Sequence, residues 1–303
     1  MSPRFVFRSP SKPKPPKGDG VTERGFFSFS WERIHTLAID TETTGLDPWG
    51  ALGVDRKTAP HRPFFISICD TDGNLASFRF PVDKKTREVQ FPPRDRRSPN
   101  LQMLLDCIES PNITKILANY KFDAQMLKKA FGVTFQGRIV DVLLTQYLMD
   151  PTAYNIDLKR VCAKFLKIGS EDEDALHAAT LEGRREAKAK GWAVAEEVKA
   201  DYHLAAPEVL AEYGERDAFR TMALHQAQQE ALNNPENEGT LFAPGVRELI
   251  EREHQVMMEL FRMEETGVRI DTGTLGDLRD LYQGITNENA NIIAREAKTK
   301  DFN

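Results

Sequence analysis

Apolar and polar positions follow two different periods along the chain, and together they predict an α/β domain over residues 31–232. Short, partly β-branched apolar runs bounded by turn-forming residues predict five strands. We expect these strands at residues 37–39, 63–70, 75–80, 115–118 and 138–142. Apolar stripes at helical spacing predict helices between and after the strands. We expect them at residues 99–110, 119–131, 143–149, 155–166 and 207–224. This order of strands and helices is typical of one layered α/β domain.

The segments that flank this domain have other patterns. Residues 1–30 predict a basic, proline-rich disordered tail, because residues 1–20 contain five prolines and five basic residues but one acid. Residues 233–303 predict a linker followed by two long helices, Leu249–Glu265 and Thr274 to about Lys298. Within the domain, the acidic run Glu171–Asp174 predicts a short loop.

Two basic segments leave alternatives open. The tail can be a solvated extension or a segment that contacts nucleic-acid phosphates. Residues 84–97, which hold six basic residues, form either a solvated face or a DNA contact. Residues 175–200 have helical periodicity, but they contain no pattern that predicts a functional site.

Composition narrows the class of protein. The 303 residues are 40% hydrophobic and 29% charged, with a net charge of −5, as in ordinary globular proteins. This charge argues against a uniformly basic surface, but it does not exclude nucleic acid as a partner, because an enzyme needs only a local basic rim. Three cysteines without metal-ligand spacing indicate reduced thiols and a cytoplasmic protein. The sequence has no apolar run of membrane-spanning length and no secretory signal, so we expect no membrane partner.

The first candidate site lies where the first predicted strand ends. Side chains alternate faces along a strand, so Asp40 and Glu42 point the same way if the strand extends that far. Two carboxylates on one face at a buried strand end repel each other unless a cation lies between them. Oxygen ligands of this kind suit Mg²⁺ or Mn²⁺. The alternative is an exposed strand end with two solvated acids.

Two further pairs of polar residues have helical spacing. Asn119 and Asp123 lie four residues apart at a predicted helix start, so both can face the crevice beyond the strand ends. Tyr213 and Asp217 lie on a helix stripe that is otherwise apolar. A buried acid on such a stripe needs an ion pair or a metal. Asp217 is therefore either a metal ligand or a salt-bridged core acid, and Tyr213 is either a site residue or an ordinary core aromatic.

Taken together, the order Asp-x-Glu, Asn-x₃-Asp and Tyr-x₃-Asp resembles the three exonuclease motifs of the DEDD superfamily, in the branch with tyrosine in the third motif. Residues 155–166 are similar to the helix between the second and third motifs in family A DNA polymerases. Residues 263–271 resemble the segment where that family's exonuclease domain continues into the polymerase thumb, and Phe302-Asn303 resembles the start of a further motif.

This resemblance implies the proofreading 3′–5′ exonuclease domain of a polymerase I-like enzyme, of bacteriophage or bacterial type. The implied fold is RNase H-like, with a five-stranded mixed sheet over residues 31–232 and thumb-like helices within residues 233–303. The catalytic part of a family A polymerase is absent from the sequence, so we expect no DNA synthesis. The chain is then either a fragment of a longer polymerase or a stand-alone exonuclease.

The resemblance also implies a two-metal mechanism. Asp40, Glu42, Asp123 and Asp217 would bind two divalent ions, Mg²⁺ or in its place Mn²⁺, with Asp40 bridging them. Tyr213 would orient the attacking water, since a phenol with a pKa near 10 is a poor general base.

The expected substrate is a single-stranded or frayed 3′ DNA end, shortened to nucleoside monophosphates. The residues expected to touch it flank the motifs and are Thr43, Leu46, Asn119, Lys121 and Phe122. A covalently linked or separate polymerase domain is the other implied partner. Alternatives are a ribonuclease D-like exoribonuclease, a catalytically silent polymerase scaffold and an RNase H-like endonuclease. The endonuclease has no need of the Tyr-x₃-Asp motif.

Overall fold

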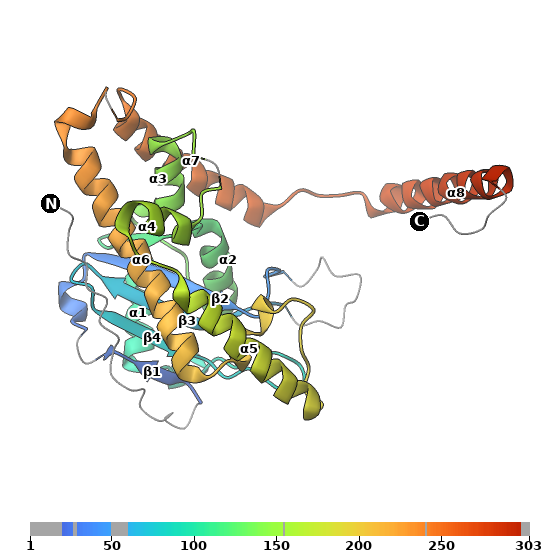
Figure 1. Cartoon of the computed structure of the whole chain (residues 1–303), viewed down its shortest axis with the longest axis horizontal. Helices are drawn as coiled ribbons and strands as arrows, with labels where there is room; N and C mark the ends of the chain where they lie inside the picture. The colour runs from blue at the N-terminus through green and yellow to red at the C-terminus, as the bar shows by residue number, and fades with distance from the viewer. Residues whose placement is uncertain (1–19, 27–28, 50–59, 154, 240, 298–303) are drawn as a thin grey trace. The chain divides into compact units, whose positions relative to one another are not determined.

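The computed structural model divides the chain into two compact units, Met1–Met258 and Glu259–Asn303. The structure describes residues 20–26, 29–49, 60–153, 155–239 and 241–297. Predictions for residues 1–19 and for Phe302-Asn303 lie outside the described residues. Figure 1 shows the sheet and its helices in the first unit.

The first unit contains a six-stranded mixed sheet with the strand order β1-β4-β3-β2-β5-β6. The strands are β1 (Thr22–Arg24), β2 (Thr36–Thr43), β3 (Pro63–Asp70), β4 (Leu75–Arg79), β5 (Thr114–Leu117) and β6 (Ile139–Asp141). β1, β4, β3 and β2 are antiparallel neighbours, whereas β2, β5 and β6 are parallel. The predicted α/β class and mixed sheet are confirmed, and the count of five strands is wrong.

The strand that the sequence analysis missed is β1. It lies in the segment predicted as a disordered tail, and its residues Thr22 to Arg24 pair with β4. Three polar residues give no apolar pattern, but the buried Arg24 side chain forms an ion pair with Glu215 at 3.3 Å. Tertiary contacts therefore order this part of the predicted tail.

Helices cover the sheet and form the core with it (Figure 1). They are α1 (Pro99–Glu109), α2 (Tyr120–Phe131), α3 (Val142–Met149), α4 (Leu158–Leu166), α5 (Glu171–Ala189) and α6 (Pro207–Asn233). Short 3₁₀ turns include η4 (Lys199–Leu204) and η5 (Pro235–Asn237). α6 contacts β2, β3 and β4, and also α3, α4 and α5. It is the central helix of the unit, and side chains of β2, β3, β5 and β6 pack with it in one apolar cluster.

The acidic run Glu171–Asp174 is the first turn of α5 and not the predicted loop. Acidic side chains at a helix N-terminus are favoured by the helix dipole, so this composition promotes a helix start. One member, Asp172, is buried and pairs with Arg220 of α6. The run therefore attaches α5 to the central helix.

The first compact unit extends beyond residue 232, where the predicted exonuclease domain ends. η5 and the first part of α7 (Val246–Thr266) belong to the first unit. Leu232, Val246 and Ile250 form a small apolar cluster there. In addition, Asp141 donates its backbone N–H to His254 Nε2 at 2.8 Å, which joins α7 to the end of β6.

The second unit contains the end of α7 and all of α8 (Thr272–Ala297). Two long helices were predicted in this region, and both are present. α8 has no buried residue and exposes several large apolar side chains, including Leu281 and Tyr282. None of the helices in the described ranges combines the length and apolarity that a membrane span requires.

A close approach of α6 to β3 depends on Gly214. A Cβ atom at this position would lie 2.6 Å from the Phe65 ring, and Ser67 Oγ donates to the Gly214 carbonyl at 2.7 Å. We expect Gly214→Ala to destabilise the protein by about 1–3 kcal/mol, because α6 must move away from the sheet. Thermal unfolding measures this loss. Gly276→Ala on α8, where nothing lies within 4 Å of the new methyl, should not show it.

Candidate active site

Three carboxylates from two elements converge beside the end of β2. Asp40 and Glu42 lie on β2 and Asp217 on α6, and one oxygen of each lies within 4.8 Å of the others. β2 continues through both acids, so they share a face of the strand as predicted. The central helix supplies the third group because α6 packs against this strand. Among the described residues, this is the one such group with metal-ligand geometry.

The shared location makes these acids hard to ionise. Burial, and next the charge of Asp217, raise the pKa of Asp40 to about 8. Burial and the charges of Asp40 and Asp217 raise the pKa of Glu42 well above its ordinary value. Burial also raises the pKa of Asp217, although Lys159 and Arg220 oppose this shift. A cation among these oxygens would relieve the repulsion.

Asp123, the fourth predicted acid, lies outside the three-carboxylate group. Its carboxylate accepts a 2.5 Å hydrogen bond from Thr41 Oγ1. Thr41 is on the opposite face of β2 from Asp40 and Glu42, because side chains alternate along a strand. Nevertheless, burial and then the charge of Asp40 raise the pKa of Asp123 well above its ordinary value, so the two acids are electrostatically coupled.

The predicted site tyrosine contacts a lysine from α4. Tyr213 is buried, and its phenol oxygen accepts a 2.6 Å hydrogen bond from Lys159 Nζ. The same ammonium lies 3.3 Å from Asp217 Oδ2. Burial and the charges of Glu42 and Asp217 raise the pKa of Tyr213 above its ordinary value of 10. The phenol is therefore protonated at neutral pH and is available as a hydrogen-bond donor.

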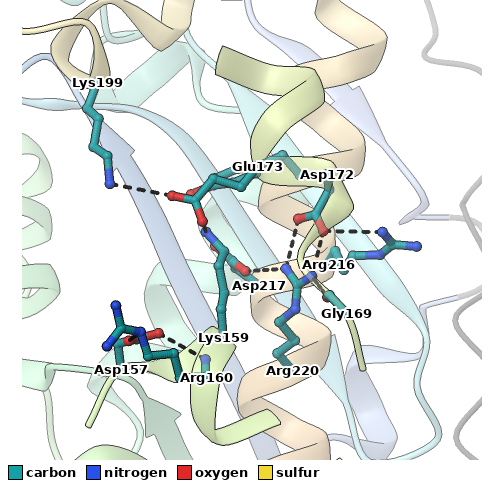
Figure 2. A network of polar contacts seen from close by, with 11 residues as sticks. Asp157, Lys159, Arg160, Gly169, Asp172, Glu173, Lys199, Arg216, Asp217 and Arg220 are labelled. Atoms are coloured by element: carbon teal, nitrogen blue, oxygen red, sulfur yellow. Dashed lines mark hydrogen bonds and ion pairs between the residues drawn. The ribbon is translucent and has the colours of Figure 1, made fainter. Parts of the chain in front are cut away.

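A buried arginine holds the other oxygen of Asp217. Arg220 is fully buried, and its Nη1 donates to Asp217 Oδ1 at 2.7 Å. It also donates to Asp172 Oδ1 and Oδ2 at 2.5 and 2.8 Å and to the Gly169 carbonyl. Arg216 contacts Asp172 at 3.2 Å. Figure 2 shows how this network connects the start of α5 to α6.

The second motif is positioned by Asp141 at the end of β6. Its Oδ2 accepts the Tyr120 N–H at the start of α2, at 2.8 Å. Its Oδ1 accepts the N–H groups of Leu143 and Leu144 and caps α3. One carboxylate therefore fixes the starts of two helices, and α2 carries Asp123 in its first turn.

The predicted substrate contacts take different positions. Thr43 is buried and donates to the Gly45 carbonyl at 2.8 Å, so its hydroxyl closes the turn after β2. Leu46 is 73% exposed just beyond that turn. Asn119 is exposed, in the left-handed backbone region (φ 70°) before α2, while Lys121 and Phe122 are half-buried in the first turn of α2. Their roles in substrate binding remain predictions.

Sequence reasoning missed Lys159 and Arg220. Lys159 lies on a strongly amphipathic helix, where a lysine usually faces solvent. Arg220 had a detectable signal, because it follows Asp217 by three residues and shares its helix face. The acidic run at residues 171–174 contains its partner Asp172, but the sequence analysis predicts a loop there.

A family model of 3′–5′ exonucleases matches residues 30–232. The chain therefore belongs to this family of 3′–5′ exonuclease domains, within the DEDD superfamily. Its fold is the RNase H-like α/β fold of these nucleases. The enzyme class is thus a nuclease that hydrolyses nucleic acid from its ends.

Several solved structures are similar to this chain. NrnC of Brucella melitensis has 19% identity and a TM-score of 0.44, covering 75% of this chain and 87% of that one. The POL domain of Pol1 from M. smegmatis has 14% identity and a TM-score of 0.43, covering 90% of this chain and 36% of that one. The catalytic core of a mutant RRP6 from Trypanosoma brucei has 11% identity and a TM-score of 0.43, covering 74% of this chain and 47% of that one. A comparison with curated proteins finds no match.

The donor set fits the divalent metals that DEDD exonucleases use. Asp40, Glu42 and Asp217 offer hard carboxylate oxygens, which suit Mg²⁺ or Mn²⁺. Burial is the largest cause of the raised pKa of each acid, and a bound cation would favour their charged forms. These residues could therefore hold a metal ion.

Proposed function

We propose that the protein is a metal-dependent 3′–5′ exodeoxyribonuclease, which shortens single-stranded or frayed 3′ DNA ends to nucleoside monophosphates. The observation that carries this proposal is the convergence of Asp40, Glu42 and Asp217 within 4.8 Å. In a family of 3′–5′ exonucleases, such a group supports phosphodiester hydrolysis at this place.

In the proposed mechanism, two divalent ions bind at the carboxylates. Asp40, Glu42 and Asp217 would hold one ion, and Asp123 together with Asp40 would hold the second, directly or through water. When bound, such ions supply acidity for the attacking water and positive charge for the leaving 3′ oxygen. The chain's own contribution is to fix these acids on β2, α2 and α6.

Tyr213 has the role of orienting the attacking water. Its phenol oxygen accepts the bond from Lys159, and the hydroxyl keeps a proton that it can donate toward the reacting groups. Its raised pKa supports a donor role and argues against a role as general base.

Tyr213→Phe tests this role. It removes the hydroxyl but keeps the ring, which packs edge-on against Tyr202. We expect the turnover rate to fall by about 10- to 100-fold through misplacement of the water. Mn²⁺ affinity should stay within about two-fold, because the carboxylates are intact. Single-turnover hydrolysis and calorimetry measure the two quantities, and an unchanged rate would contradict the assigned role.

The substrate is proposed to be DNA because residues 263–271 resemble the segment that joins the exonuclease domain to the thumb in family A DNA polymerases. By the same argument, the domain is the proofreading part of a family A DNA polymerase. The polymerase domain is either covalently linked to it or a separate chain, and the protein acts in the cytoplasm. Leu46, exposed just beyond the turn that follows β2, would provide an apolar surface for a terminal base. The second candidate is an exoribonuclease, which shares the acids and the tyrosine.

One experiment tests the function directly. A 5′-labelled single-stranded DNA and an RNA of the same sequence are incubated with the protein and Mg²⁺. We expect a ladder that shortens stepwise from the 3′ end of DNA, and no ladder with chelator or with the Asp40→Ala, Glu42→Ala double variant. Faster shortening of RNA would favour the exoribonuclease. If neither DNA nor RNA is shortened by the wild-type protein, the result would favour a catalytically silent polymerase scaffold.

A further inference from the structure

The ammonium group of Lys159 lies among three oxygens at the edge of the carboxylate group. Its Nζ is 2.6 Å from the Tyr213 hydroxyl, 3.3 Å from Asp217 Oδ2 and 3.8 Å from Glu173 Oε2. The side chain is only 16% exposed, and its Nζ lies over the Tyr213 ring, 4.1 Å from the centroid. This lysine is therefore an internal cation beside the acids.

Both oxygens of Asp217 face a cation. Oδ1 accepts from Arg220, whereas Oδ2 lies against Lys159. Arg220 is fixed, because its guanidinium also binds Asp172 and the Gly169 carbonyl. A metal ion that binds Asp217 must therefore share an oxygen with one of these cations. Lys159, a point charge on a flexible stem, is the one able to move.

Glu173 provides a second place for the lysine. It lies on the first turn of α5, with Oε2 toward Lys159 and Oε1 3.5 Å from Lys199 Nζ. Lys199 is 73% exposed, so water can solvate it when Glu173 takes another partner. Figure 2 shows the resulting series of charges from Lys199 through Glu173 and Lys159 to Asp217.

From this geometry we propose that Lys159 is a built-in competitor of the divalent ion for Asp217, and that Glu173 receives the lysine when the ion binds. The inference rests on the proposed metal-dependent function. The affinity for metal then depends on how Asp217 and Glu173 compete for the Lys159 ammonium, in addition to how strongly the ligands bind the ion. Lys159 lowers that affinity, and Glu173 raises it by drawing the lysine away.

The test is calorimetric titration of Mn²⁺ into the full chain, without nucleic acid. Lys159→Met keeps the aliphatic stem and removes the charge, and we expect Mn²⁺ to bind about 10-fold more tightly. Melting in chelator should occur at a lower temperature than in the wild type, because the acids lose their internal cation. Lys164→Met, an exposed lysine on the same helix, is the matched control and should change neither quantity.

Glu173→Gln examines the other partner and does not depend on the Lys159 variant folding well. We expect Mn²⁺ to bind several-fold more weakly than in the wild type, and this loss to disappear when Lys159→Met is added. Unchanged or weaker binding by Lys159→Met overturns the inference, as does an additive double variant. Absence of Mn²⁺ binding in the wild type itself would instead overturn the proposed function.

Discussion

Asp40→Asn should abolish nucleotide release and at the same time stabilise the protein in chelator. Asp40 is proposed to bind both ions, so its loss should lower the turnover rate by about 10³-fold or more, equivalent to about 4 kcal/mol of transition-state stabilisation. The stability gain follows from its pKa, which burial and the charge of Asp217 raise to about 8. An uncharged amide avoids that repulsion.

The stability gain should depend on pH. A raised pKa means that the folded protein holds the proton more tightly than the unfolded chain, so the charged form destabilises the fold. This penalty is absent below the ordinary pKa of 3.8 and increases as the pH rises toward 8. The melting temperature of Asp40→Asn in chelator should therefore exceed that of the wild type by a margin that grows between pH 5 and about pH 8.

Asp106→Asn, an exposed change of the same type on α1, provides the control. It should leave both the activity and the melting temperature as in the wild type. A margin for Asp40→Asn that shrinks with rising pH would show that Asp40 is not a repelled acid in the folded protein.

Arg220→Met should produce the largest loss of stability. The side chain is fully buried and binds two buried acids and a backbone carbonyl. Removal leaves Asp172 and Asp217 without their main cation, which typically costs about 3–5 kcal/mol. For a unit of this size, the melting temperature should fall by roughly 10 °C. Mn²⁺ affinity should also fall, because Asp217 loses the bond that fixes its orientation.

Arg216→Met is a matched control on the same helix. Arg216 contacts Asp172 at the longer distance of 3.2 Å, and its side chain is 25% exposed, so we expect a loss below about 1 kcal/mol. Thermal unfolding of the two variants separates the buried pair from the outer one. Equal losses would mean that general charge, and not the fixed network around Arg220, stabilises α5 against α6.

Much of the fold was predictable because its main strands are apolar runs that end at turn formers. β3 spans Pro63–Asp70 as expected, and the Asp70–Asn74 turn is closed by Asp70 Oδ1, which accepts the N–H groups of Asp72 and Asn74. Local signals of this kind need no knowledge of distant residues. β1 has no such signal, since its order depends on β4 and on the Arg24–Glu215 pair.

The candidate site was predictable to the extent that its spacing reflects strand and helix periods. Asp40 and Glu42 share a face through the strand period, and α6 presents Asp217 to them. The position of Asp123 beside Thr41 was not predictable, because it depends on how α2 packs against β2. Lys159 and Arg220 were missed for a similar reason. Lys159 contacts Tyr213, 54 residues away in the sequence, and Arg220 contacts Asp172, 48 residues away, because α4 and α5 pack against α6.

The burial of α6 has a consequence for mutational tolerance. From Tyr213 to His225, every residue except Arg216 is buried, so this stretch has no solvent face on which substitutions are harmless. One side carries the active-site groups, and another holds Glu215 against Ser77 and Arg24. In a saturation library, this stretch should accept almost no replacements, whereas α8, with no buried residue, should accept most. Substitutions that accumulate among functional variants should therefore lie outside this central helix of the first unit.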